Sequence, residues 1–532
     1  YKTGIPAMDD QELILNAAND LLNNVPDMWD KGAYCYRFPN QNGFVLFVAL
    51  GLKIFGADNQ MVFQYLNIPM LILSAFFLSK TIYLLFNDKK LARYSYILLL
   101  GFFQLNCYVT FVYGTLYGLA ASVAGIFLLI KYFKKRNIVN GLVGISLLSI
   151  GYGFKSNYLI MIVAAFLLLL FDAIVKKSLK SIISLVWGIV FYVVVVTSIS
   201  STIYHLTGKK VDEGTPNTAW VAMGLQESYK APGWWNGYNA KVFADNEYDI
   251  SKTKEAISQN ISERMEELKK DKDYTMSFFS KKTASQWSEG TFECFYITNL
   301  DRGRLSNPTW TDSVKNLMVD GHSANRAVTT ICNYFIVFLW LGIILFLIFD
   351  FRKLDAYKLI FAITFIGGFL FHLVWEAKGQ YTIIYAYLMI PYMLRGYQLL
   401  LRRVCNISLG EKEAKEKRGT IIPVVVIALV VIVIGISNNK VVNETIKLNG
   451  DKERYESYMS HQVDDLDDGN YTIIPGNDSS VTLAGLIDND KKYSDKFAVD
   501  CSLISLCNKN SNGISDQSLG ILEGKMDPGT TV

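Results

Sequence analysis

The chain has 532 residues, of which 51% are hydrophobic and 14% are aromatic, and its formal net charge is +4. Several runs approach or exceed the roughly 18 to 20 apolar residues that span a bilayer. This composition excludes an ordinary soluble globular protein, and the small net charge gives no indication of nucleic-acid binding. We therefore predict an all-α polytopic membrane protein.

The chain opens with a polar first loop over residues 1–61. Apolar residues recur at helical spacing up to Leu21, which predicts a helix with Asp10 on its apolar face and Asp9 on its polar face. A carboxylate on an apolar face is costly unless it has a partner or a task, so Asp10 is a candidate catalytic group. Asp9 fits a capping box with Glu12 at the start of the helix.

Membrane spans follow the first loop. Phe44–Phe55 is apolar but too short to span, and we interpret it as an interfacial helix on the side of the first loop. About ten spans come after it. Because the chain begins with Tyr1 rather than Met, we also expect a membrane helix upstream. The expected spans are 62–86, 94–112, 116–133, 138–153, 157–175, 180–203, 328–350, 357–376, 381–401 and 419–438.

The basic residues indicate which side of the membrane each connection faces. Alternate connections carry clusters such as Lys134, Lys135 and Arg136, whereas the other short connections hold Lys155, Lys378 and little else. Cytoplasmic loops of membrane proteins have an excess of Lys and Arg, so the basic set is predicted to be cytoplasmic. The first loop, the long loop between the sixth and seventh spans, and the C-terminal tail are then extracytoplasmic.

The long outer loop, over 204–326, is rich in aromatic residues, among them Trp234, Trp235 and Trp287. Aromatic residues beside a membrane are usually interfacial anchors, and the functional alternative is stacking on sugar rings or packing over a lipid head group. In the tail, a short β-branched run from Tyr471 that ends in Pro-Gly predicts a strand and a turn. We expect a small α/β module there.

Few ionisable residues lie at the outer ends of the expected spans. Lys155 is at one such end, and Glu376, Lys378 and Tyr381 are at another. Charges near the membrane interior are candidates for function, while the plainer alternative is that the lysines snorkel and Glu376 pairs with one of them. The sequence contains no zinc motif, Walker loop or dinucleotide fingerprint, so no cofactor is predicted, and dependence on a divalent metal stays open.

One carboxylate beside two cations at a membrane surface suits the transfer of a sugar from a polyprenyl phosphate. Lys155 and Lys378 would stabilise the charge that grows on the leaving phosphate. Asp10 would take the proton from an acceptor hydroxyl as its oxygen attacks the anomeric carbon, in a direct inverting displacement.

Four stretches of the sequence together carry a resemblance to a known family. They are Asp10-Gln11-Glu12, Tyr36 to Gly43 with the helix that follows, Phe154-Lys155-Ser156-Asn157, and Trp375 to Tyr381. With them the chain resembles the polyprenyl-phosphate-sugar-dependent type C (GT-C) glycosyltransferases, and is similar above all to bacterial relatives of protein O-mannosyltransferases and of aminoarabinose lipid A transferases. The resemblance covers residues 1–438. It implies a catalytic acid in the first outer loop, a lipid donor in a membrane cavity, and a membrane helix before the first loop.

The resemblance implies that Asp10 is the catalytic acid, with Asp9 as the fallback. The chain departs from the family at two positions: Gln11 follows the acid where relatives commonly have Glu, and Gln380 stands where relatives often have Arg. The second departure puts a phosphate contact at Gln380 in doubt, and Lys378 is the candidate to replace it.

We therefore expect a transmembrane glycosyltransferase domain over 1–438 and an extracytoplasmic domain over 439–532, in the cytoplasmic membrane of a cell. Its partners would be a polyprenyl-phosphate sugar, a glycan, lipid or protein acceptor, and the bilayer. The alternative is a cell-envelope polysaccharide polymerase or a lipid-linked oligosaccharide flippase. A flippase should carry charges midway along several spans, and the expected spans are largely uncharged at their centres.

Overall fold

The computed structural model describes residues 7–56, 59–228, 230–298, 313–314, 316–319, 322–350, 356–404, 425 and 428–437, and two strands at 471–475 and 481–485. The described chain is mostly helical. Among the described residues, six helices are long and apolar enough to cross a membrane, which confirms the coarse prediction of a helical, multi-pass membrane protein. They run over Met61–Phe86, Thr115–Lys135, Ser156–Val175, Leu179–Thr207, Asn316–Asp350 and Ala356–Val374.

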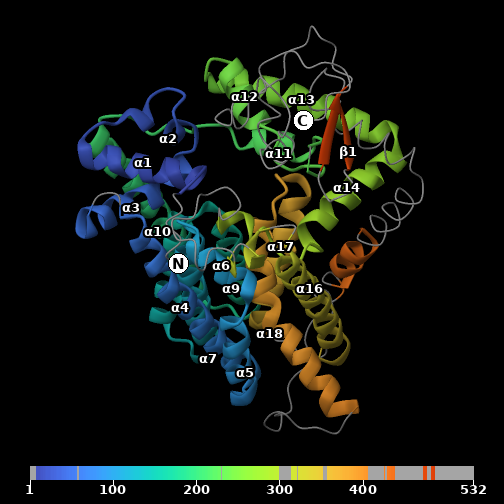
Figure 1. The fold of residues 1–532 in the computed structure, drawn as a ribbon. Helices are drawn as coiled ribbons and strands as arrows, with labels where there is room; N and C mark the ends of the chain where they lie inside the picture. The colour runs from blue at the N-terminus through green and yellow to red at the C-terminus, as the bar shows by residue number, and fades with distance from the viewer. Residues whose placement is uncertain are drawn as a thin grey trace.

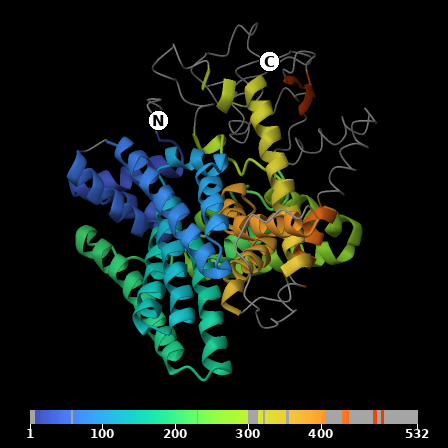
Figure 2. The same ribbon diagram turned by 90° about the horizontal axis from the view of Figure 1, so that it is seen from below.

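The helices form two groups within the bundle. Figure 2 shows α7 to α10 gathered on one side, and α16 to α18 on the other. The first group and its neighbours are α4 (Met61–Phe86), α5 (Lys89–Leu100), α6 (Phe103–Cys107), η3 (Tyr108–Thr110), α7 (Thr115–Lys135), α8 (Ile138–Phe154), η4 (Ser156–Tyr158), α9 (Leu159–Val175) and α10 (Leu179–Thr207). The second is α16 (Ser323–Asp350), η7 (Ala356–Leu359), α17 (Ile360–Val374) and α18 (Gly379–Val404), and a further short apolar helix covers Ala428–Ser437.

The expected span over 94–112 is wrong as a single helix, because the chain leaves the helix at Gly101 and continues as two short pieces, α6 and η3. The break leaves carbonyl groups without helical partners. Asn67, buried in α4, donates from Nδ2 to the carbonyl oxygens of Val109 and Phe111, at 3.0 Å each. A side chain from a neighbouring helix thus satisfies backbone groups that the broken helix leaves without helical partners.

The first loop folds into helices beside this bundle: α1 (Asp10–Asn23), η1 (Asp27–Trp29), α2 (Tyr34–Arg37), η2 (Pro39–Gln41) and α3 (Asn42–Phe55). A helix is thus present over Phe44–Phe55 as part of α3, and its apolar residues pack with those of α1 in a second core that also includes Phe63, Val112, Tyr117 and Ile203. The long outer loop forms a layer across one end of the bundle (Figure 1). It contains α11 (Thr218–Gly224), α12 (Tyr238–Asp245), α13 (Ile250–Lys270), α14 (Lys272–Trp287) and η5 (Tyr296–Thr298).

The described part of the C-terminal tail is an antiparallel hairpin of β1 (Tyr471–Pro475) and β2 (Val481–Gly485), with Tyr471 opposite Gly485. The strand predicted from Tyr471 is therefore present. The rest of the expected α/β module and its boundary at 438/439 lie outside the described residues, and the module stays a prediction.

Candidate functional site

Lys155 lies at the turn between α8 and η4, and only 6% of it is exposed. Its Nζ donates to Thr115 Oγ1 at 2.8 Å and lies 4.9 Å from the centre of the Tyr113 ring. Gly114 makes this approach possible, since a Cβ atom there would meet the carbonyl oxygen of Phe154 at 2.0 Å. The lysine head group is thus held against the start of α7.

The turn between α17 and α18 brings the other predicted charges to the same place. Lys155 Nζ lies 5.7 Å from the centre of the Tyr381 ring, and Lys378 Nζ lies 5.8 Å from it. The Tyr381 hydroxyl donates to Glu376 Oε2 at 3.1 Å. His372 stacks on the same ring with a centroid distance of 5.8 Å. Two lysines and one carboxylate therefore meet around one tyrosine.

Asp10 joins this cluster from the first loop, but not in the way that its sequence pattern indicated. The buried face of α1 carries Gln11, Ile14, Ala17 and Ala18, whereas Asp10 is exposed. Gln11 Oε1 accepts from the Val112 amide at 2.8 Å, so Gln11 is the polar residue that the buried face tolerates. The prediction of an Asp10 side chain on the apolar face is wrong by one helical position.

The capping role predicted for Asp9 is also absent. Its side chain makes no cap hydrogen bond, and its backbone has a φ of 54°, in the left-handed region. The Tyr296 hydroxyl approaches Asp9 Oδ2 at 3.4 Å, which links the first loop to the outer loop.

The charges act on one another strongly because several of them are buried. Burial, followed by repulsion from Lys378, lowers the pKa of Lys155 to about 7, and Asp10 partly opposes this shift. Burial opposes the charge of Lys378, but Glu376, Glu293 and Asp10 together raise its pKa. Burial raises the pKa of Glu376, and Lys378 and the Tyr381 hydroxyl counteract it. Asp10 therefore lies within electrostatic reach of both lysines.

Asp10 also lies close to two buried tyrosines. Burial and then Asp10 are the leading causes that raise the pKa of both Tyr34 and Tyr113. Gln41 donates to the Tyr113 hydroxyl from the start of α3. The arrangement thus combines an exposed carboxylate with a buried lysine and a partly buried one.

The outer loop holds the Trp375–Lys378 segment in place. Lys282, fully buried in α14, donates to the carbonyl oxygens of Gly224 and Trp375, the second at 2.8 Å. The Ala377 amide donates to the Gly233 carbonyl oxygen at 2.7 Å. Burial lowers the pKa of Lys282 to about 7, although Glu376 opposes the shift.

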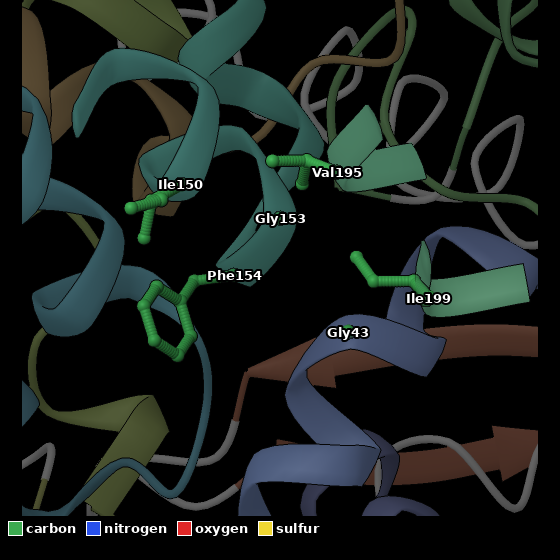
Figure 3. A pocket seen from close by; sticks show the side chains of 6 residues that line it. All are labelled: Gly43, Ile150, Gly153, Phe154, Val195 and Ile199. Atoms are coloured by element: carbon green, nitrogen blue, oxygen red, sulfur yellow. The ribbon is translucent and has the colours of Figure 1, made fainter. Parts of the chain in front are cut away.

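An apolar groove lies at the end of α8, and Phe154, the residue before Lys155, is part of its wall. Its volume is about 160 Å³, and its wall comes from α3, α8 and α10. Figure 3 shows the side chains of Ile150, Phe154, Val195 and Ile199 around the open space, with Gly43 and Gly153 close by. A cavity of about 150 Å³ with aliphatic and aromatic walls is large enough for a benzene-sized hydrocarbon.

The predicted tryptophans are not equivalent. Trp287 is 2% exposed and packs against Phe365, Phe369 and Tyr385, so its ring is part of the helix core and is covered from substrate. Trp234 is 5% exposed and donates to Ser285 Oγ at 2.8 Å. Trp235 is 45% exposed and is the one of the three that could contact a ligand without rearrangement.

The structure thus brings together Asp10, Lys155, Glu376, Lys378 and Tyr381. Sequence reasoning missed Tyr113, Gln41, Lys282 and Glu293, because their roles depend on contacts between distant segments. Buried Lys282 had no local signal, since it lies among charged residues of a polar loop. Among the described residues, no group of three or more His, Cys, Asp or Glu side chains is arranged to hold a metal ion.

No protein-family model, curated protein or solved structure matches this chain.

Proposed function

We propose that this protein is a membrane glycosyltransferase that moves a sugar from a polyprenyl-phosphate donor to an extracytoplasmic acceptor. The observation that carries the proposal is the meeting of Asp10, Lys155 and Lys378, which come from the first loop and two separate helix ends. A transferase of this kind needs one base for the acceptor and cations for the leaving phosphate.

In the proposed reaction, the phosphate of the donor lies between Lys155 and Lys378, with the sugar toward Asp10. The oxygen of the acceptor hydroxyl forms a bond to the anomeric carbon, and the bond from that carbon to the phosphate oxygen breaks. The phosphate leaves with the bonding electron pair, and the hydroxyl proton passes to the Asp10 carboxylate. Attack from the side opposite the leaving group inverts the anomeric configuration.

Each lysine would contribute differently to binding of the phosphate. Lys378 is held in its charged form by the surrounding carboxylates, so it offers a fixed positive charge. Lys155 has a pKa near 7 without ligand, and a phosphate placed beside it would favour its charged form. Donor binding should therefore be accompanied by proton uptake near and above neutral pH.

The apolar groove at Phe154 supports a lipid-linked donor rather than a soluble one. The wall of the groove is apolar and includes Phe154, the residue before Lys155, so the groove is suited to the first branched units of a polyprenyl chain. A soluble sugar nucleotide would leave that surface without an occupant.

A transfer assay with Asp10→Asn tests the proposal. The protein is placed in membranes with radiolabelled polyprenyl-phosphate sugars, and loss of label from the lipid is measured. We expect a loss of at least about 100-fold in rate, in the range found for removal of a general base. Asp9→Asn is the matched control and should keep activity within a few fold.

Equal activity of Asp10→Asn and wild type would remove Asp10 from its proposed role. If Asp9→Asn is the inactive variant, the base belongs at Asp9. Wild-type protein that consumes none of the polyprenyl-phosphate sugars would contradict the transferase proposal itself and favour the flippase alternative.

A further inference from the structure

We propose that Glu293, in the outer loop, is a positioning residue that sets the place and charge of Lys378 for the donor phosphate. The inference rests on the proposed transferase function. Glu293 lies in a segment about 85 residues before Lys378 in the chain, and no sequence pattern identifies it as a functional residue.

The two oxygens of the Glu293 carboxylate bond to different partners. Its Oε2 accepts from the backbone amide of Gln380 at 3.1 Å, in the first turn of α18. Its Oε1 accepts from Lys230 Nζ at 3.1 Å, and that ammonium also lies 3.9 Å from the centre of the Trp234 ring. The Glu293 side chain is only 7% exposed, whereas the Lys230 side chain is 47% exposed, so the bond to Gln380 is the more sheltered of the two.

The contact with Gln380 places the carboxylate directly beside the lysine-bearing turn. A Cβ atom on Gly379 would meet Glu293 Cγ at 3.3 Å, so a glycine at the start of α18 allows this close packing. Glu293 is also one of the carboxylates that keep the pKa of Lys378 high. One side chain therefore fixes both the backbone after Lys378 and the charge of its ammonium.

The turn that carries Glu293 is strained and is held from several sides. Phe292 and Glu293 have φ values of 51° and 57°, a left-handed conformation that is unfavourable for residues other than glycine. The Tyr108 hydroxyl donates to the Phe292 carbonyl oxygen at 2.7 Å, and Gln104 Nε2 donates to that of Gly290 at 2.9 Å. Strain of this kind persists where the surroundings fix the chain, and it is concentrated at functional sites.

A double-mutant cycle separates positioning through Lys378 from a general structural role. We expect Glu293→Ala to lower the transfer rate at saturating donor by 10-fold or more, and Lys378→Met to lower it further. If Glu293 acts through Lys378, the double variant is no slower than Lys378→Met alone. Glu293→Gln, which keeps an acceptor for the Gln380 amide, should lose less than Glu293→Ala.

Glu289→Gln is the matched control, because Glu289 belongs to the same loop and bonds to Thr291 rather than to α18. It should keep the rate within about twofold. The proposal would be overturned if the fold-losses in transfer rate from Glu293→Ala and Lys378→Met multiply in the double variant. An unchanged transfer rate in Glu293→Ala would also overturn it.

Amide hydrogen exchange gives a readout that does not depend on the donor. The peptide containing Gln380 should exchange at least about 10-fold faster in Glu293→Ala than in wild type, and Glu289→Gln should match wild type. Unchanged exchange would contradict the positioning role even if the protein transfers sugar. Faster exchange in a protein that transfers no sugar would support the contact while refuting the proposed function.

Discussion

Replacing Lys155 by Met should make the protein more stable and less active at the same time. Burial lowers the pKa of Lys155 to about 7, from 10.5 for the free side chain. One pKa unit corresponds to about 1.4 kcal/mol, so holding this lysine in place at pH 7 costs about 4 kcal/mol relative to the unfolded chain. Loss of the hydrogen bond to Thr115 costs about 1 kcal/mol, and Met keeps most of the packing of the stem. Lys155→Met should thus raise the free energy of unfolding by about 3 kcal/mol.

The lowered pKa of Lys155 also determines how its effect on the free energy of unfolding changes with pH. Between about pH 7 and pH 10.5 the unfolded chain binds more protons at this lysine than the folded chain, so the contribution of Lys155 to stability rises with pH across that window. Lys282 has a similarly lowered pKa and contributes the same slope. The advantage of Lys155→Met over wild type should therefore shrink as the pH rises and vanish near pH 10.5.

Denaturant unfolding in detergent micelles at pH 7 and pH 10.5 measures both quantities, and the transfer assay measures activity. We expect the transfer rate of Lys155→Met to fall by about 100-fold, as for loss of one group that stabilises the leaving charge. A variant that is less stable than wild type at pH 7, or equally stabilised at both pH values, would refute the assignment of Lys155 as a buried and costly charge.

Three further predictions follow from individual contacts. Gln11→Leu leaves the buried Val112 amide without its acceptor and should lower the free energy of unfolding by about 1 to 3 kcal/mol, measured by denaturant titration; an unchanged midpoint would contradict the role of Gln11. Trp287→Ala should cost about 3 to 5 kcal/mol in the same measurement, whereas Trp235→Ala should leave stability within about 0.5 kcal/mol, and equal effects would argue against their different burial. Val195→Trp fills the apolar groove and should weaken binding of a polyprenyl phosphate about 10-fold without loss of stability; unchanged affinity would show that the lipid lies elsewhere.

Much of the architecture could be predicted because membrane spans and short interfacial helices have strong, local signals. The apolar runs that became α4, α7, α9, α10 and α17 are long enough to identify by composition alone. The prediction of a single span over 94–112 was wrong for a reason that the composition does not show. The helix ends at Gly101, where Asn106 Nδ2 donates to the Leu100 carbonyl oxygen at 2.9 Å. Further along, Asn67 from another helix donates to the carbonyl oxygens of Val109 and Phe111.

Some residues of the candidate site could also be predicted from the sequence, because they have a local signal. Lys155, Glu376 and Lys378 stand out because few charges lie at the span ends that are predicted to face outward. The orientation of Asp10 was predicted wrongly by one position. Helical spacing alone favoured Asp10 on the buried face of α1, but Gln11 lies there instead, because its side chain accepts a hydrogen bond from the Val112 amide. Glu293 could not be found, because its role exists only once the outer loop packs on α18.

The stereochemistry of transfer tests the account most directly. Wild-type protein in membranes is given one polyprenyl-phosphate sugar of known anomeric configuration, and the configuration of the sugar on the isolated product is determined by NMR. The account predicts that the donor is consumed and that the product has the opposite configuration, because a single carboxylate serves as base and no second one acts as a nucleophile. Retention of configuration, or no consumption of any polyprenyl-phosphate sugar, would contradict it.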